Sequence, residues 1–195
     1  MLLVVADTGP IGNLVEIGHI GILPQLFERV FIPSLVRDEL SHPSAPASVR
    51  DWVNAPPAWL EVLPVTVSDD PAFRSLDDGE KAALALGITL GADLILIDDR
   101  KGAAVALKKG FQIVGTLGLL TRSAQRGLLD LADALGRLKH TTFPIARNCS
   151  MAPGGLGSIM GWPVAGRGRV VRCLLAFLAN GAFQGSRDIK EALHG

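Results

Sequence analysis

The chain has 195 residues, of which 48% are hydrophobic and 19% are charged, and its mean hydropathy is +0.34. These values exclude an intrinsically disordered chain and favour one domain with a sizeable core and buried parallel strands. The 19 Lys+Arg residues balance the 19 Asp+Glu residues. This balance excludes a protein that binds nucleic acid through a strong overall positive charge.

Strand-like and helix-like patterns alternate from the N-terminus onward, which predicts βαβ units in a parallel sheet. A strand over residues 2–6 precedes Asp7. Two short helices are expected within residues 11–27, and the interior positions in them are Leu14, Ile17, Ile22 and Leu26. A strand at 30–32 leads into a helix opened by Pro33 and Ser34, with Ser34 as N-cap and Glu39 in the last turn.

The middle of the chain continues this alternation. A Pro-rich loop over residues 43–58 surrounds a short helix at 48–53, and a strand follows at 60–63. Residues 77–91 give the clearest helix, because an acidic start, an Ala/Leu period and a final glycine occur together. The next elements predicted are a strand at 94–97, a helix at 100–109, a strand at 112–114, a helix that Thr116 caps and that runs to about 126, and one more helix to 139.

Charge and composition both change near residue 145. The first 145 residues hold 13 basic and 17 acidic residues, whereas residues 146–195 hold 6 basic and 2 acidic residues. Residues 146–195 are rich in Gly, Pro and Met without a sustained period. We therefore expect a folded domain over residues 1–145 and a C-terminal tail over residues 146–195, for which no structure is predicted.

The compartment is predicted from cysteines and apolar runs. Cys149 and Cys173 form no CxxC motif and lie in the tail, which argues against a zinc site and a disulfide framework. The apolar start lacks a basic leader region and is too short to span a membrane. We expect a soluble cytoplasmic protein that does not contact a membrane.

Several carboxylates follow predicted strands or begin predicted helices. Asp7 and the pair Asp98-Asp99 follow strands, Glu80 lies at a helix start, and Glu39 could approach from the side. Sites in open parallel sheets form at the carboxyl edge, so Asp7 and Asp98 could face one crevice. Converging carboxylates raise one another's pKa unless a cation neutralises them. The hard oxygen ligands favour Mg²⁺ or Mn²⁺.

Each acid also has a structural interpretation, which stays open at this point. Asp7 could end a strand in a turn, and Asp98-Asp99 could cap the helix at 100–109. Asp77 and Glu80 have the spacing of a capping box, and Glu39 could be a solvated surface charge. The basic residues near this region could touch an RNA backbone, but a solvated helix face is the better-supported interpretation; they are Arg100, Lys101, Lys108 and Lys109.

Four segments occur together in one order: VVADTGPIGNLVEIGHIGIL, IPSLVRDEL, LDDGEKAALALG and LILIDDRKGAAVALKKGFQIVGTLGLLTRSAQRGLL. Through them the chain resembles the PIN-domain ribonucleases, within a bacterial and archaeal branch related to VapC-type toxins. The resemblance covers residues 1 to about 130. It implies an α/β three-layer sandwich, a central parallel sheet flanked by helices, with acids that bind Mg²⁺ or Mn²⁺ and hydrolysis of RNA.

The resemblance also assigns residues by motif. The four acids are Asp7, Glu39, Glu80 and either Asp98 or Asp99, because Ile97 departs from the Thr that many members carry near the fourth acid. Thr8 and Thr116 match polar positions near the metals. Asp7, Glu80 and Asp98 are expected to hold metal, while Glu39 and Asp99 are ligands or position the attacking water.

The resulting prediction is a metal-dependent endoribonuclease, the toxin of a toxin-antitoxin system. A homodimer and a small antitoxin partner are implied by the resemblance only. The alternative is a catalytically inactive PIN-like module that binds RNA or protein. A phosphoryl-accepting α/β domain, with Asp7 or Asp98 as nucleophile, is a weaker alternative because the first strand is not followed by a DxDxT motif.

Overall fold

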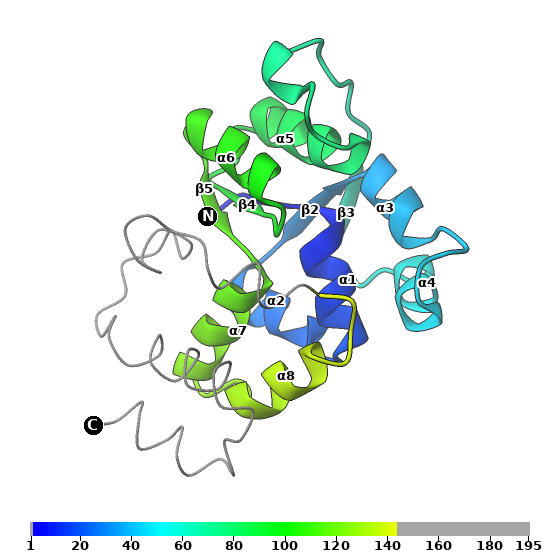
Figure 1. Cartoon of the computed structure of the whole chain (residues 1–195), viewed down its shortest axis with the longest axis vertical. Helices are drawn as coiled ribbons and strands as arrows, with labels where there is room; N and C mark the ends of the chain where they lie inside the picture. Colours follow the sequence, from blue (N-terminus) through cyan, green and yellow to red (C-terminus); the bar gives the residue numbers. More distant parts are fainter. Residues whose placement is uncertain (1, 144–195) are drawn as a thin grey trace. The chain divides into compact units, whose positions relative to one another are not determined.

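Five parallel strands form one sheet in the computed structural model, which describes residues 2–143 of the chain (Figure 1). The strand order is β3-β2-β1-β4-β5. The strands are β1 (Val4–Ala6), β2 (Val30–Pro33), β3 (Leu60–Leu63), β4 (Leu94–Leu96) and β5 (Gln112–Val114). After β1, strands β2 and β3 are added toward one edge of the sheet, and β4 and β5 are then added on the other side of β1. The strand order therefore reverses between β1 and β4, where open α/β sheets form their sites.

The central strands are wholly apolar and buried, as a sheet covered on both faces requires. Every residue of β1 and β4 is buried. In the register of the sheet, Val5 pairs with Phe31 of β2 on one side and with Ile95 of β4 on the other. Because β1 and β4 are in register to Ala6 and Leu96, the residues that follow them emerge at the same edge.

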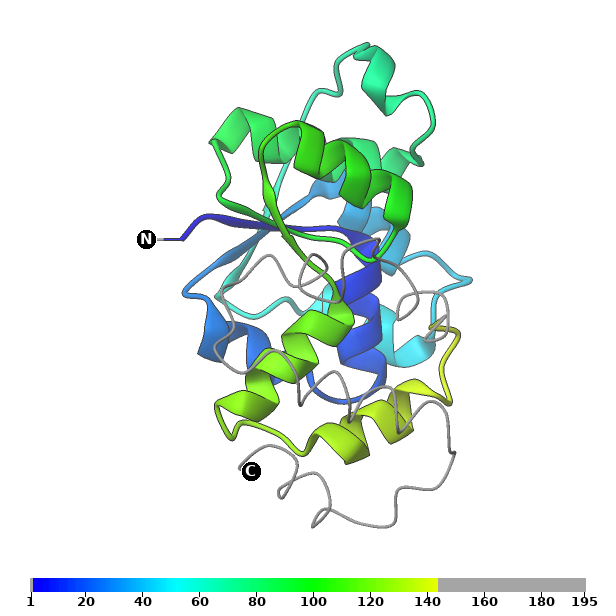
Figure 2. The same cartoon turned by 60° about the vertical axis from the view of Figure 1, so that its left-hand side comes forward.

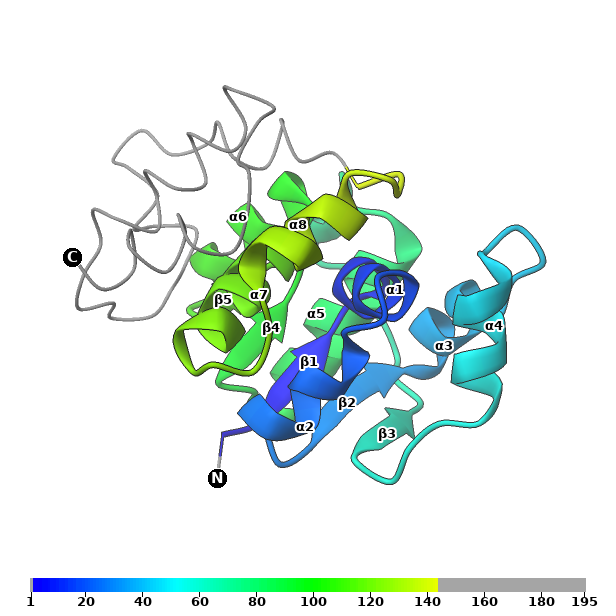
Figure 3. The ribbon, with the colours of Figure 1, turned by 90° about the horizontal axis from the view of Figure 1, so that it is seen from below.

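Helices cover both faces of the sheet. They are α1 (Thr8–Glu16), α2 (Leu23–Leu26), α3 (Ser34–Leu40), α4 (Ala47–Asn54), α5 (Asp78–Leu90) and α6 (Arg100–Lys108), with short 3-10 turns η1 (Ile20–Ile22) and η2 (Pro71–Phe73). Figure 2 shows α5 and α6 on one face and α1 on the other, and Figure 3 shows α1 and α2 from that second side. Ala83, Leu84 and Leu86 of α5 pack in one core with Val5 and Ile95. The predicted α/β sandwich is confirmed.

The contacts divide the chain into two compact units, Met1–Thr116 and Leu117–Gly195. The sheet and helices α1 to α6 belong to the first unit. In the second unit, residues 117–143 are described and contain α8 (Leu131–Leu138) and all but the first residue of α7 (Thr116–Gln125). The carboxylate of Asp130 starts α8 by accepting hydrogen bonds from the N–H groups of Ala132 and Asp133, at 2.8 and 3.1 Å. The predicted tail, residues 146–195, lies outside the described residues.

The predicted strands and helices are present, with four local differences. Thr116 was expected to cap α7, but it is the first residue of that helix. Ser34 was expected to be the N-cap of α3, and this expectation is wrong. Pro33 is the N-cap, with an extended ψ of 153°, and Ser34 is the first helical residue. Leu26 is only partly buried, because α2 is a single turn that turns Leu23 and Phe27 inward instead. The turn η2 was not predicted.

No helix in the part of the chain that the structure describes combines the length and apolar character needed to cross a membrane.

Candidate active site

Asp7 lies between β1 and α1, at the carboxyl edge of the sheet. Its N–H donates to the Leu96 carbonyl oxygen of β4, at 2.9 Å, which ties it to the neighbouring strand. Asp7 is 7% exposed. It occupies the N-cap position of α1, yet its side chain makes no capping hydrogen bond. A capping role therefore does not account for this buried carboxylate.

The pKa of Asp7 is raised from 3.8 to about 7, mainly because burial disfavours the charged form. The N–H of Thr8 opposes this rise. The negative charges of Asp77, Glu39 and Asp98 add to it. These three acids come from the start of α5, from α3 and from the end of β4. Acids from three separate elements therefore act electrostatically on Asp7.

Glu39, in the last turn of α3, is held between α1 and α5. Its Oε2 accepts a hydrogen bond from Thr8 Oγ1. A Cβ atom at Gly79 would lie 2.5 Å from Oε2 and 2.8 Å from Oε1, so the carboxylate occupies the space that glycine leaves in the first turn of α5. Burial raises the pKa of Glu39, the Thr8 hydroxyl lowers it, and the charge of Asp77 raises it further.

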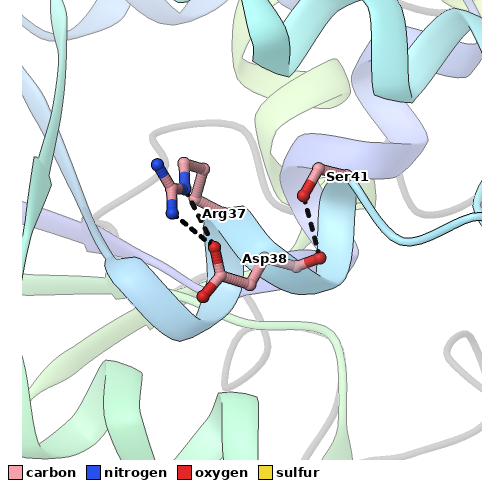
Figure 4. Close-up of polar contacts among 3 residues, drawn as sticks. All are labelled: Arg37, Asp38 and Ser41. Carbon is pink, nitrogen blue, oxygen red and sulfur yellow. Dashed lines mark hydrogen bonds and ion pairs between the residues drawn. The ribbon is translucent and has the colours of Figure 1, made fainter.

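The neighbours of Glu39 on α3 have other partners (Figure 4). The Arg37 guanidinium donates to Asp38 Oδ1 from Nε at 3.0 Å and from Nη2 at 2.6 Å. Ser41 Oγ donates to the Asp38 carbonyl oxygen at 3.0 Å. Arg37 is thus paired with an exposed acid, Asp38, and not with Glu39. The carboxylate of Glu39 is stabilised by hydrogen bonds instead.

The predicted capping box at the start of α5 is confirmed. The Glu80 N–H donates to Asp77 Oδ1 at 2.8 Å, and the Asp77 N–H donates to Glu80 Oε2 at 3.1 Å. Glu80 is nevertheless only 4% exposed. Burial, followed by the charge of Asp77, raises the pKa of Glu80 to about 8, and Asp99 and Asp7 contribute further. Capping explains the hydrogen bonds of Glu80 but not its burial among like charges.

Asp98 follows β4, and three donors hold its carboxylate. Oδ1 accepts from the Thr116 N–H at 2.8 Å, and Oδ2 accepts from Thr116 Oγ1 at 2.6 Å and from Asn13 Nδ2 at 3.0 Å. The carboxylate also lies close to two glycines, because a Cβ atom would be 3.4 Å from Oδ2 at Gly9 and 2.7 Å from Oδ1 at Gly115. Burial raises the pKa of Asp98, and the hydrogen bonds from Thr116 and Asn13 oppose that rise.

Asp99 has a different environment from its neighbour. It is the N-cap of α6, and its Oδ1 accepts from the N–H groups of Lys101 and Gly102, at 2.6 and 3.2 Å. Desolvation raises the pKa of Asp99, but these N–H groups and a side-chain hydrogen bond with Glu80 outweigh it, so the pKa is lowered. The two adjacent aspartates therefore differ: Asp98 lies among the hydrogen-bond donors of Asn13 and Thr116, and Asp99 caps a helix.

A family model described as a PIN domain matches residues 3–150. The chain belongs to the PIN-domain family. Comparisons with curated proteins and with solved structures found no match. The predicted family is confirmed, and PIN domains are generally nucleases, a class of hydrolases.

In this PIN domain, the predicted site residues surround Asp7. Glu39 and Asp98 are close enough to Asp7 for their charges to raise its pKa. Thr8 and Thr116, the two predicted polar positions, hydrogen-bond to Glu39 and Asp98 respectively. Glu80 interacts with Asp7 as well, through charge. Asp99 is exposed and caps α6, and its side chain also hydrogen-bonds with Glu80.

Two further residues belong to this constellation of the PIN domain and were not selected from the sequence. Asn13 of α1 donates to Asp98. Asp77, considered only as a cap, has a charge that raises the pKa of Asp7, Glu39 and Glu80. For Asn13, the one available sequence signal was a polar residue between Ile11 and Leu14, which are buried. No local pattern distinguishes Asp77 from an ordinary cap.

Lys81 and Lys109 pair with acids that are not among the predicted site residues. The ion pairs between described residues include none of the acids Asp7, Glu80 and Asp98. Lys109, one of the residues considered for RNA contact, pairs with Asp70 at 2.5 Å and lies 5.9 Å from the ring centroid of Phe73. Lys109 therefore anchors the segment around η2.

The donor chemistry of the site fits a hard divalent cation. Within residues 2–143, no three His, Cys, Asp or Glu side chains already adopt an arrangement that would hold a metal ion. The carboxylates of Asp7, Glu80 and Asp98 are nevertheless oxygen donors with raised pKa values, and desolvation is the main cause of each rise. A cation would favour their ionised forms, and binding would require the side chains to move.

Proposed function

We propose that this PIN domain is a Mg²⁺- or Mn²⁺-dependent endoribonuclease of the VapC-like branch, acting as the toxin of a toxin-antitoxin pair. The observation that carries the proposal is a pair of buried carboxylates, Asp7 and Glu80, whose pKa values are about 7 and 8. Burying such groups without a basic partner is costly. A divalent cation offsets that cost, and it explains why the acids converge on one edge of the sheet.

The proposal gives each acid a part. Asp7, Glu80 and Asp98 would hold the metal, which when bound supplies electrophilic stabilisation of the phosphate. Glu39, which accepts from the Thr8 hydroxyl and from the Gly79 N–H, would position the attacking water or take a proton from it. We assign Asp98 rather than Asp99 to the fourth motif, because Asp99 is already the N-cap of α6.

RNA is the proposed substrate, and a small antitoxin and a second copy of the chain are the proposed partners. All three come from the VapC-like resemblance. Residues 1–145 also hold more acidic than basic residues, so a cation is needed between this negatively charged domain and the RNA polyanion. Light scattering of the purified chain tests the dimer directly.

The central test is cleavage of a mixed RNA pool in EDTA, Mg²⁺ or Mn²⁺. Wild type is compared with Asp7→Asn and Asp98→Asn, and with Asp51→Asn as a matched control, because Asp51 is an exposed acid on α4. We expect cleavage that needs metal, is lost in both site variants and is kept in the control. Cleavage that persists in EDTA, or that all variants share, contradicts the proposal.

A second candidate is a PIN-like module that binds RNA or protein without cutting. The observation in its favour is that no preformed metal arrangement exists within residues 2–143. Glu80 and Asp98 also already accept hydrogen bonds, from the Asp77 N–H and from the Thr116 hydroxyl. RNA binding that is unchanged by EDTA, together with no cleavage in any metal, would favour this candidate.

A further inference from the structure

Helix α1 presents polar groups to acids from two other parts of the fold. Asp7 is its N-cap, and Thr8, its first residue, donates to Glu39. Asn13 lies further along the helix and donates to Asp98. Ile11 and Leu14, close to Asn13 in the helix, are fully buried, whereas Glu16 is exposed. Asn13 is therefore a half-buried polar residue next to core positions of α1.

One face of α1 lies against Oδ2 of Asp98. Asn13 Nδ2 lies 3.0 Å from this oxygen and 3.3 Å from Thr116 Oγ1. Gly9 precedes Asn13 by one helical turn, so the two share a face. A Cβ atom at Gly9 would be 3.4 Å from the same Oδ2. The glycine leaves room for the carboxylate and Asn13 supplies its hydrogen bond.

The three donors do not use every acceptor position of the Asp98 carboxylate. An ionised carboxylate has about four acceptor positions, two on each oxygen. Asn13 and the Thr116 hydroxyl take both positions on Oδ2, whereas the Thr116 N–H takes one on Oδ1. Oδ1 therefore keeps one acceptor position. All three donors are neutral, so they orient the carboxylate without cancelling its charge, as a Lys or Arg would.

We propose that Asn13 is a positioning residue for Asp98, whose amide holds Oδ2 and so fixes the orientation of the carboxylate that a divalent cation would bind. This inference rests on the proposed function, because it assumes that Asp98 is a metal ligand. Partners that orient a ligand commonly change metal affinity or activity by about 10- to 100-fold when they are removed.

A purely structural role for Asn13 would give a different result. In that case the amide only ties α1 to the end of β4 and to Thr116. Its removal would lower the free energy of unfolding in EDTA and leave metal affinity unchanged. Metal affinity, measured without RNA, therefore separates the two roles.

The test uses the full chain with Asn13→Leu, which keeps the branched shape without a donor, and Asn13→Ser, which is smaller. The same two changes at Asn54, an exposed residue at the end of α4, serve as controls. Three quantities are measured: Mn²⁺ binding by the loss of the free Mn²⁺ electron paramagnetic resonance signal, the free energy of unfolding in EDTA, and the kcat and KM of RNA cleavage. Asn13→Ser keeps the test valid if Asn13→Leu does not fold.

We expect both Asn13 variants to bind Mn²⁺ about 10-fold more weakly, with a lower kcat and an unchanged KM for RNA, and the Asn54 variants to match wild type. Asn13 variants that bind Mn²⁺ as wild type does overturn the inference, even if they are less stable, and leave the proposed function intact. A wild-type chain that neither binds Mn²⁺ nor cuts RNA overturns the proposed function, and the role of Asn13 with it.

Discussion

Replacing Asp7 with Asn should stabilise the protein at about pH 8 when no divalent metal is present. The pKa of Asp7 is about 7 in the folded chain, against an ordinary value of 3.8. The folded state therefore binds this proton more tightly than the unfolded state. The stability contributed by protonated Asp7 is complete below about pH 4 and is lost as the pH rises through about 7. With about 1.4 kcal/mol for each pKa unit, the loss is about 4 kcal/mol by pH 8.

The assay is urea unfolding of wild type, Asp7→Asn and the exposed control Asp51→Asn in EDTA, at about pH 5 and about pH 8. Asn keeps the size of the side chain but cannot ionise. The advantage of Asp7→Asn over wild type should grow by about 2 to 3 kcal/mol between the two pH values, and the control should show no such change. Added Mn²⁺ should stabilise wild type more than Asp7→Asn at the higher pH. Parallel pH profiles for wild type and Asp7→Asn would refute the argument that Asp7 ionises at a cost in the folded state.

Two other changes have clear expectations. Glu80→Gln should be about 1 kcal/mol more stable than Glu80→Ala in urea unfolding at the same pH, because Gln can still accept from the Asp77 N–H in the capping box; equal stabilities would mean that the box contributes nothing to α5. Asp99→Ala should lower the free energy of unfolding by about 1 kcal/mol through loss of the α6 cap, and should weaken Mn²⁺ binding less than Asp98→Asn does. The reverse order of Mn²⁺ affinities would assign the fourth motif to Asp99.

Much of the fold could be predicted because the relevant signals are local. The apolar runs that form β1 and β4 are continuous and lie between polar or turn residues, which is typical of strands buried on both faces. The box of Asp77 and Glu80 joins residues three apart, so spacing alone predicted it. Ser34 was misassigned because Pro33 and Ser34 both suit a helix start, and spacing could not say which of them takes the extended cap conformation.

The candidate site was predicted in part for a topological reason. Parallel strands end at one edge, so acids that follow β1 and β4 had to come near one another once those strands were neighbours. The site assignments themselves stay predictions until the variants are tested. The sequence also offered each acid a structural role, and Asp77, Glu80 and Asp99 make the capping hydrogen bonds that such a role requires.

The sequence by itself determined the order of the strands and helices, the family and the acids that a site could use, because these depend on patterns within one element. Tertiary structure alone decided that Asn13 meets Asp98 across 85 residues of chain and that Thr8 meets Glu39 across 31. It also separated Asp98 from Asp99, although the two are adjacent. The physical reason is that hydrogen bonds between distant residues depend on which strands are neighbours and which helix faces meet them, and neither is encoded in local spacing.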